Sequence, residues 1–125
     1  MKPDLKTLFK SKIDKYGLLD ASKMLCIEPK KLIDDLELPY KVFEDIKFEL
    51  HPYVEGVKSY IEFENGYAVS IIKTEYSYGG THGLYELAIL KDGDIVYDTP
   101  ITNDVVGHLT PEEVTEYMLK IQDLC

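Results

Sequence analysis

Three stretches of the chain carry residue types that could do chemistry. The first is the glycine-rich run Gly79-Gly80-Thr81-His82-Gly83, because glycine-rich loops can cradle a phosphate group. The phosphate loops of nucleotide-binding proteins join a strand to a helix and end in Lys followed by Ser or Thr. This run joins two predicted strands and lacks that ending, so we predict a long, mobile hairpin loop that needs positive φ angles.

The second stretch holds oxygen and nitrogen ligands at Asp98, Asn103, Asp104 and His108. Oxygen ligands this close could hold a hard cation, but their spacing does not follow the calcium-loop pattern and Pro100 interrupts it. Asp and Asn residues in such positions more often cap turns through backbone hydrogen bonds. We therefore predict neither a metal site nor a cofactor.

The third stretch is the set of tyrosines around the glycine-rich run. Tyr76, Tyr78, His82 and Tyr85 could together present an aromatic binding surface. A small molecule or nucleotide is one ligand that such a surface could take, and another protein is the alternative.

Catalysis has less support in the sequence. The histidines at positions 51, 82 and 108 are scattered, and neither Cys26 nor Cys125 lies in a recognisable nucleophile setting. We predict no catalytic residue and leave the enzyme question open, leaning towards a non-enzymatic protein. The two cysteines are far apart and have no secretory context, so we expect reduced thiols and a cytoplasmic location.

The element that would position the aromatic surface is an antiparallel sheet between Val57 and Asp98. The pairs Asn65-Gly66 and Asp92-Gly93 separate runs of strand-forming residues, and both are typical of two-residue hairpin turns. Such turns predict the partners Phe63 with Ala68, Ile61 with Ser70, Lys91 with Asp94, and Leu90 with Ile95. Apolar residues on both faces of this sheet predict that helices cover both faces, at least in part.

Helices are predicted at both ends of the chain. The first runs from about Pro3 to Tyr16, with apolar residues at three- and four-residue spacing, and Asp20 would cap a short second helix. Pro29 can begin a third helix. At the other end, Thr110 followed by Glu113 forms a capping box, so we predict a C-terminal helix with the apolar stripe Val114, Tyr117, Met118 and Ile121.

The charge changes sharply along the chain. The net charge is −9, made of +2 over residues 1 to 41 (nine Lys, seven Asp and Glu) and −11 over residues 42 to 125 (five Lys, sixteen Asp and Glu). An acidic surface repels nucleic acid and membranes and favours basic protein surfaces. We place a domain boundary there, giving a helical subdomain, 1–41, and an acidic sheet domain, 42–125. Residues 45–50 alternate in polarity and predict a first strand.

The helical subdomain resembles helix-turn-helix proteins. The run Ala-Ser-Lys-Met-Leu-Cys-Ile-Glu-Pro, residues 21–29, is similar to their Ala-Ala-x-Leu-Leu-Gly-Val-Ser-Pro pattern. Cys26 replaces the usual turn glycine, and acidic residues follow along the supposed recognition helix. The resemblance implies a tri-helical shape, and it implies an alternative function: a DNA-binding regulator that places Lys23, Lys30 and Lys31 on phosphates, with a dimerising or ligand-sensing sheet domain.

The second half resembles a segment of small uncharacterised proteins of tailed bacteriophages. The runs that carry the resemblance are Gly83 to Ala88 and Tyr97 to Thr110. We therefore expect an α+β protein in which a helix-turn-helix-like three-helix subdomain precedes a four- or five-stranded antiparallel sheet packed with a C-terminal helix. The expected function is that of a non-enzymatic phage accessory protein, which binds a host or phage protein through its acidic sheet domain and modulates a nucleic-acid-binding or defence factor. We expect no membrane contact, and a dimer is compatible with either function.

Overall fold

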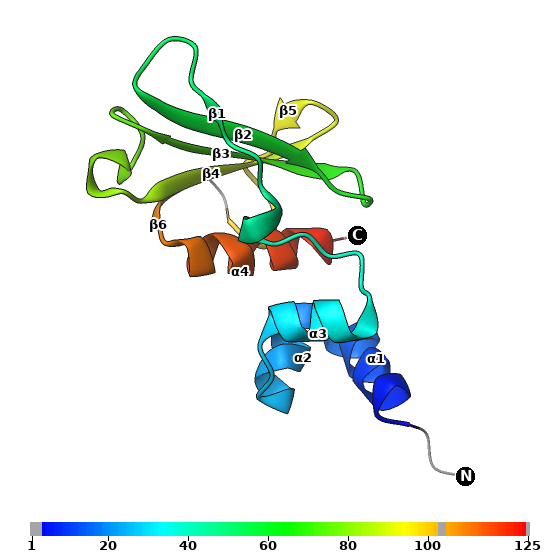
Figure 1. The fold of residues 1–125 in the computed structure, drawn as a ribbon. Coiled ribbons are helices and arrows are strands. Elements are labelled where there is room, and N and C mark those ends of the chain that lie inside the picture. The colour runs from blue at the N-terminus through cyan, green and yellow to red at the C-terminus, as the bar shows by residue number, and fades with distance from the viewer. Residues whose placement is uncertain (1–3, 103–104, 125) are drawn as a thin grey trace. The chain divides into compact units, whose positions relative to one another are not determined.

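A computed structural model describes residues 4–102 and 105–124, and the chain divides into two compact units, Met1–Lys41 and Val42–Cys125. The first unit is helical, and the second combines an antiparallel sheet with a C-terminal helix (Figure 1). The predicted α+β class is therefore confirmed. None of the helices in the described part of the chain is both long enough and apolar enough to cross a membrane.

The helical unit contains α1 (Leu5–Tyr16), α2 (Leu18–Leu25) and α3 (Pro29–Leu36). The carboxylate of Asp4 accepts a hydrogen bond of 2.8 Å from the Thr7 amide, which caps α1 and lowers the pKa of Asp4. The predicted start at Pro3 lies outside the described residues. Gly17, with a φ of 86°, is the single residue between α1 and α2.

One expectation about these helices is wrong. Because α2 begins at Leu18, Asp20 lies within its first turn and does not cap it. Of the apolar residues of α1, Ile13 is buried, whereas Leu5, Leu8 and Tyr16 are exposed. The connection from α2 to α3 keeps the geometry of a helix-turn-helix glycine, because Cys26 adopts the left-handed conformation with a φ of 55°.

The sheet domain contains six strands, all paired antiparallel in the order β1-β2-β3-β4-β5, with β6 also on β4. Their bounds are β1 (Glu49–Leu50), β2 (Gly56–Glu62), β3 (Tyr67–Thr74), β4 (Tyr85–Lys91), β5 (Asp94–Ile95) and β6 (Val106–Leu109). The short strands β5 and β6 share one edge of β4. The predicted strand over 45–50 is mostly absent, since residues 43–45 form the 3₁₀ helix η1 (Phe43–Asp45) and only β1 pairs.

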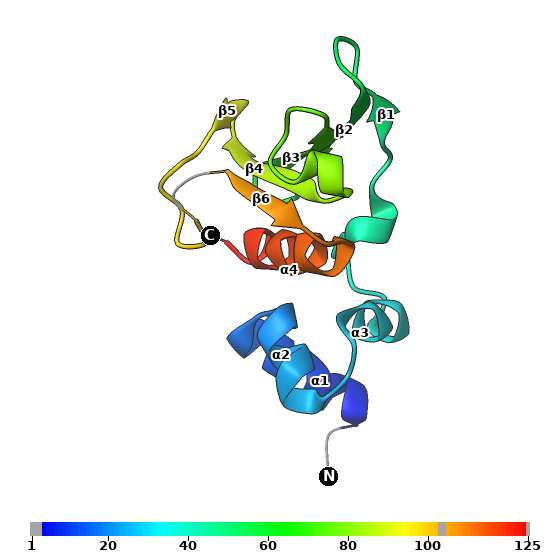
Figure 2. The ribbon, with the colours of Figure 1, turned by 90° about the vertical axis from the view of Figure 1, so that its left-hand side faces the viewer.

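The core lies between one face of the sheet and α4 (Pro111–Gln122), which runs beneath the strands in Figure 1. Thr110 and Glu113 form the predicted capping box, and Val114, Met118 and Ile121 are fully buried. They pack with the inward residues of the central strands, Val69, Ile71, Leu87 and Ile89. Within the described part of the sheet domain, no helix covers the opposite face, so the expectation that helices cover both faces is not met inside this unit (Figure 2).

The two hairpin turns differ from each other. At Asp92-Gly93 both residues have positive φ, and the predicted pairs Lys91↔Asp94 and Leu90↔Ile95 are confirmed. At Asn65-Gly66 only the glycine has positive φ, and the observed pairs, Glu62↔Ala68 and Ile61↔Val69, are shifted by one residue from the predicted ones.

The shift follows from a three-residue connection. The Phe63 amide donates to the Tyr67 carbonyl at 2.8 Å, which closes a loop of three residues with Gly66 in the left-handed position. The side-chain amide of Asn65 then donates to the carbonyls of Ile121 and Leu124, at 2.8 and 3.1 Å. One turn residue thus binds two carbonyls at the end of α4, of which that of Ile121 also accepts a hydrogen bond of 3.1 Å from the Leu124 amide.

We expect the substitution Asn65→Asp to lower the free energy of unfolding by about 1–3 kcal/mol, because a carboxylate cannot donate to the two α4 carbonyls. The matched control is Asp92→Asn in the other turn, where the φ of 54° suits both residue types and the change should stay within about 0.5 kcal/mol. Urea unfolding followed by circular dichroism measures both variants. Equal losses would contradict the role given to the Asn65 amide.

Candidate functional site

The glycine-rich loop that joins β3 to β4 is a compact, hydrogen-bonded structure. The Thr74 hydroxyl accepts hydrogen bonds from the amides of Tyr76 and Ser77, at 3.2 and 3.1 Å. In return the Ser77 hydroxyl accepts from the Thr74 amide at 2.8 Å. The chain then forms the 3₁₀ turn η2 (Gly80–His82) before entering β4. The loop therefore has many internal hydrogen bonds, and its predicted mobility stays a prediction.

The glycines of this region serve two different purposes. Gly79 and Gly83 have φ angles of 88° and 75°, as predicted for a loop that needs left-handed residues. Gly80 is required for space, because a Cβ on it would overlap the carbonyl oxygen of Thr74. Gly107 in β6 is similar, since its Cβ would overlap the Cβ of Tyr78. The loop is thus packed directly against the backbone of β6.

The predicted aromatic surface is only partly assembled. Tyr76 and Tyr78 project from the loop, with 78% and 63% of their surfaces exposed, and His82 is exposed beside them. Tyr85 belongs elsewhere: its ring packs against Phe43 and Phe48, with ring centroids 5.2 and 5.4 Å away. It shares the sheet face of Leu87 and Ile89, and it is partly buried against the core that they form.

The structure adds a second loop to this surface. Residues 51–55 join β1 to β2 at the same end of the sheet as the glycine-rich loop (Figure 1; Figure 2 looks towards this end). The amide of Glu75 donates to the carbonyl of Glu55 at 3.2 Å, which ties the two loops together. Tyr53 in the second loop is 89% exposed. The strand register would have indicated that Tyr53 lies here. Gly56 pairs with Thr74, so the loops that extend beyond these two residues must meet.

We call residues 51–55, 75–84 and 107–108 the tip. Tyr53, Tyr76 and Tyr78 are the three most exposed tyrosines in the described part of the chain, and all three lie in the tip. The three histidines of the sequence also lie there, in three different elements. His108 takes the left-handed conformation in β6, with a φ of 57°, and its amide donates to the Tyr78 carbonyl at 3.0 Å.

The three histidines can be assessed as metal ligands only together with the acids that the structure describes. Among residues 4–102 and 105–124, no three His, Cys, Asp or Glu side chains are grouped so that they could hold a metal ion. Of the weak cation candidate, Asn103 and Asp104 lie outside the described residues, as does Cys125. Cys26 is an exposed free thiol.

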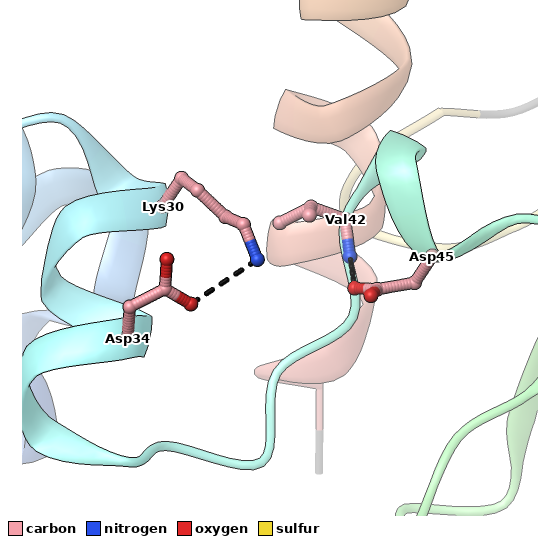
Figure 3. Close-up of polar contacts among 4 residues, drawn as sticks. All are labelled: Lys30, Asp34, Val42 and Asp45. Atoms are coloured by element: carbon pink, nitrogen blue, oxygen red, sulfur yellow. Dashed lines mark hydrogen bonds and ion pairs between the residues drawn. The ribbon is translucent and has the colours of Figure 1, made fainter.

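The lysines of the DNA-binding alternative lie on the helical unit. Lys30 and Lys31 pair with Asp34 and Asp35 one turn along α3, at 3.1 and 2.8 Å; the first pair is drawn in Figure 3. Lys31 donates a hydrogen bond to the carboxylate of Asp35, and this bond raises the pKa of Lys31. Lys23 is exposed in the last turn of α2. Two of the three lysines thus already have carboxylate partners on their own helix.

Comparisons of the chain with protein-family models, with curated proteins and with solved structures gave no match.

We expect Gly80→Ala to lower the free energy of unfolding by about 1–3 kcal/mol, because the new methyl group overlaps the Thr74 carbonyl and the loop must move. Hydrogen exchange should accelerate at the amides of residues 75–84 and remain unchanged in the turn at Asp92-Gly93. Gly83→Ala is the control: no atom lies within 4 Å of the position that its new methyl group would take, and only the φ of 75° is strained. Slower exchange in the loop of the Gly80 variant would contradict this packing.

Proposed function

We propose that this chain is a non-enzymatic binding protein that recognises another protein through its tip. The observation that carries the proposal is the placement of the three most exposed tyrosines of the described chain on two loops that are hydrogen-bonded to each other. Tyrosine supplies a large contact area at a low cost in conformational entropy, and it is enriched among the residues that dominate binding energy. The internal bonds of the glycine-rich loop would reduce the ordering cost of association further.

The charge of the sheet domain indicates the kind of partner. Residues 42–125 carry −11, so a basic protein surface would be attracted and an acidic one repelled. Proteins that bind nucleic acid present such basic surfaces. We accordingly propose a phage accessory protein that acts in the cytoplasm of the host on a nucleic-acid-binding or defence factor.

A small-molecule ligand fits the tip less well. Small-molecule sites are concave and bury most of the ligand. Tyr76 and Tyr78 are instead mostly exposed on a projecting loop, and Tyr85, which could have closed the site, is partly buried against the core. A broad contact with a protein surface uses exposed aromatic side chains more effectively.

We do not assign DNA reading to the helical unit. Duplex binding requires lysines that neutralise phosphates, whereas Lys30 and Lys31 lie beside Asp34 and Asp35. These carboxylates would approach the phosphates together with the lysines and repel them. A titration with duplex DNA at low salt tests this point, and a salt-dependent shift that disappears in the variant Lys30→Ala/Lys31→Ala would restore the DNA-binding alternative.

The variant Tyr76→Ala/Tyr78→Ala should lose at least tenfold in affinity for the captured partner, because hot-spot tyrosines contribute about 2 kcal/mol or more each. The partner is first isolated by affinity capture from a host lysate with the full chain, and its affinity is then measured by biolayer interferometry. Tyr60→Ala/Tyr97→Ala is the matched control, since these two tyrosines are also about half exposed or more but lie outside the tip. Undiminished binding by the tip variant, or an equal loss in the control, would overturn the proposal.

A further inference from the structure

The aromatic residues of the tip are accompanied by glutamates from both loops. Glu55 and Glu75 are exposed and lie opposite each other, one position beyond the pair Gly56↔Thr74, where the amide of Glu75 donates to the carbonyl of Glu55. Like charges at facing positions of antiparallel strands repel each other. A cation from outside the chain would relieve that repulsion.

A third carboxylate binds the backbone of the glycine-rich loop. The carboxylate of Glu86 in β4 accepts a hydrogen bond of 3.2 Å from the amide of Tyr78. The nearest lysine along β3, Lys73, lies over the ring of Tyr85 at 5.0 Å from its centroid. With three glutamates and one lysine, this end of the sheet has a local charge of −2 when its histidines are neutral (three negative charges, one positive). Exposed tyrosine rings and uncompensated carboxylates therefore occur together.

This combination has a specific chemical complement. A guanidinium group can stack on a tyrosine ring through cation–π attraction while it donates paired hydrogen bonds to a carboxylate. Lysine offers the charge without the planar, forked donor geometry. An acidic or purely apolar segment would leave the facing glutamates uncompensated.

Resting on the proposed function, we infer that the tip binds an arginine-bearing segment of its partner protein across both loops. The guanidinium groups lie against Tyr53, Tyr76 and Tyr78, and they pair with Glu55 and Glu75. Tyr53 contributes from the loop 51–55, so the binding surface is composite and extends beyond the glycine-rich loop. Nothing covalent takes place, and the selectivity is for arginine over lysine.

The test uses the full chain and a fluorescently labelled synthetic peptide with three arginines separated by Gly-Ser pairs. Fluorescence anisotropy at low salt gives the affinity. We expect Glu55→Gln/Glu75→Gln to weaken binding at least tenfold. The matched control, Glu112→Gln/Glu116→Gln, removes the same charge from exposed positions of α4 and should change binding less than twofold. Tyr53→Ala should also weaken binding at least fivefold, and replacing the three arginines by lysines should weaken it severalfold.

Folding of each variant is checked by thermal unfolding. Removal of the facing charges should leave the melting temperature of Glu55→Gln/Glu75→Gln equal to or above that of the parent protein, so a loss of binding cannot come from unfolding. Equal weakening by the two double variants would show that the peptide follows net charge alone, and it would overturn the inference. An unchanged affinity in Tyr53→Ala would do the same for the composite surface.

The inference and the proposed function fail in different ways. If the arginine peptide does not bind the parent protein, while Tyr76→Ala/Tyr78→Ala still abolishes binding of the captured partner, the arginine assignment is wrong and the tip remains a protein-binding site. If the peptide binds as expected but Tyr76→Ala/Tyr78→Ala leaves the affinity for the captured partner unchanged, the tip recognises arginine and the proposed function is wrong.

Discussion

The tip depends on backbone segments that approach each other more closely than side chains would permit. A Cβ at Gly80 would overlap the Thr74 carbonyl, and a Cβ at Gly107 would overlap that of Tyr78. Gly79 likewise has the Cα of His108 only 2.8 Å from the position of a Cβ. These contacts hold the loop against the end of β3 and the backbone of β6. As a result, Tyr76 and Tyr78 project from a fixed base although they lie outside the regular sheet.

The two hairpins explain how far turn chemistry alone can predict a fold. Asp92-Gly93 follows the local rule, and its predicted strand pairs are the observed ones. Asn65-Gly66 has the same signature, yet the Asn65 side chain bonds to the carbonyls at the end of α4. A two-residue turn would need a positive φ at Asn65, and the observed three-residue connection does not. Because the competing partner lies more than fifty residues away, the single-residue shift could not be read from the turn itself.

The composition of the tip was predictable in part. The alternation of residues along β4 was enough to predict where Tyr85 lies. Tyr85 is on the same face of the strand as Leu87 and Ile89, and these two residues are buried. Tyr53 was harder to find, because no local pattern marks residues 51–55 as part of a binding surface. Only the register of Gly56 with Thr74 brings this loop to the same end of the sheet as Tyr76. The C-terminal helix, its capping box and its apolar stripe were predictable from local patterns, whereas the start of α2 was not. Only the structure showed which loops, distant in the sequence, lie next to each other.

The combination of internal hydrogen bonds and exposed tyrosines in the tip bears most directly on the proposed function. A loop whose only task is to connect β3 to β4 needs neither the most exposed tyrosines of the described chain nor a carboxylate facing another across the ladder. Both features cost stability in the isolated protein, the first by leaving apolar area in water and the second by repulsion. Under the binding proposed here, a cationic, planar group would cover the rings and sit between the carboxylates, and both costs would then be removed. This physical argument is the reason for proposing that the tip is one half of an interface.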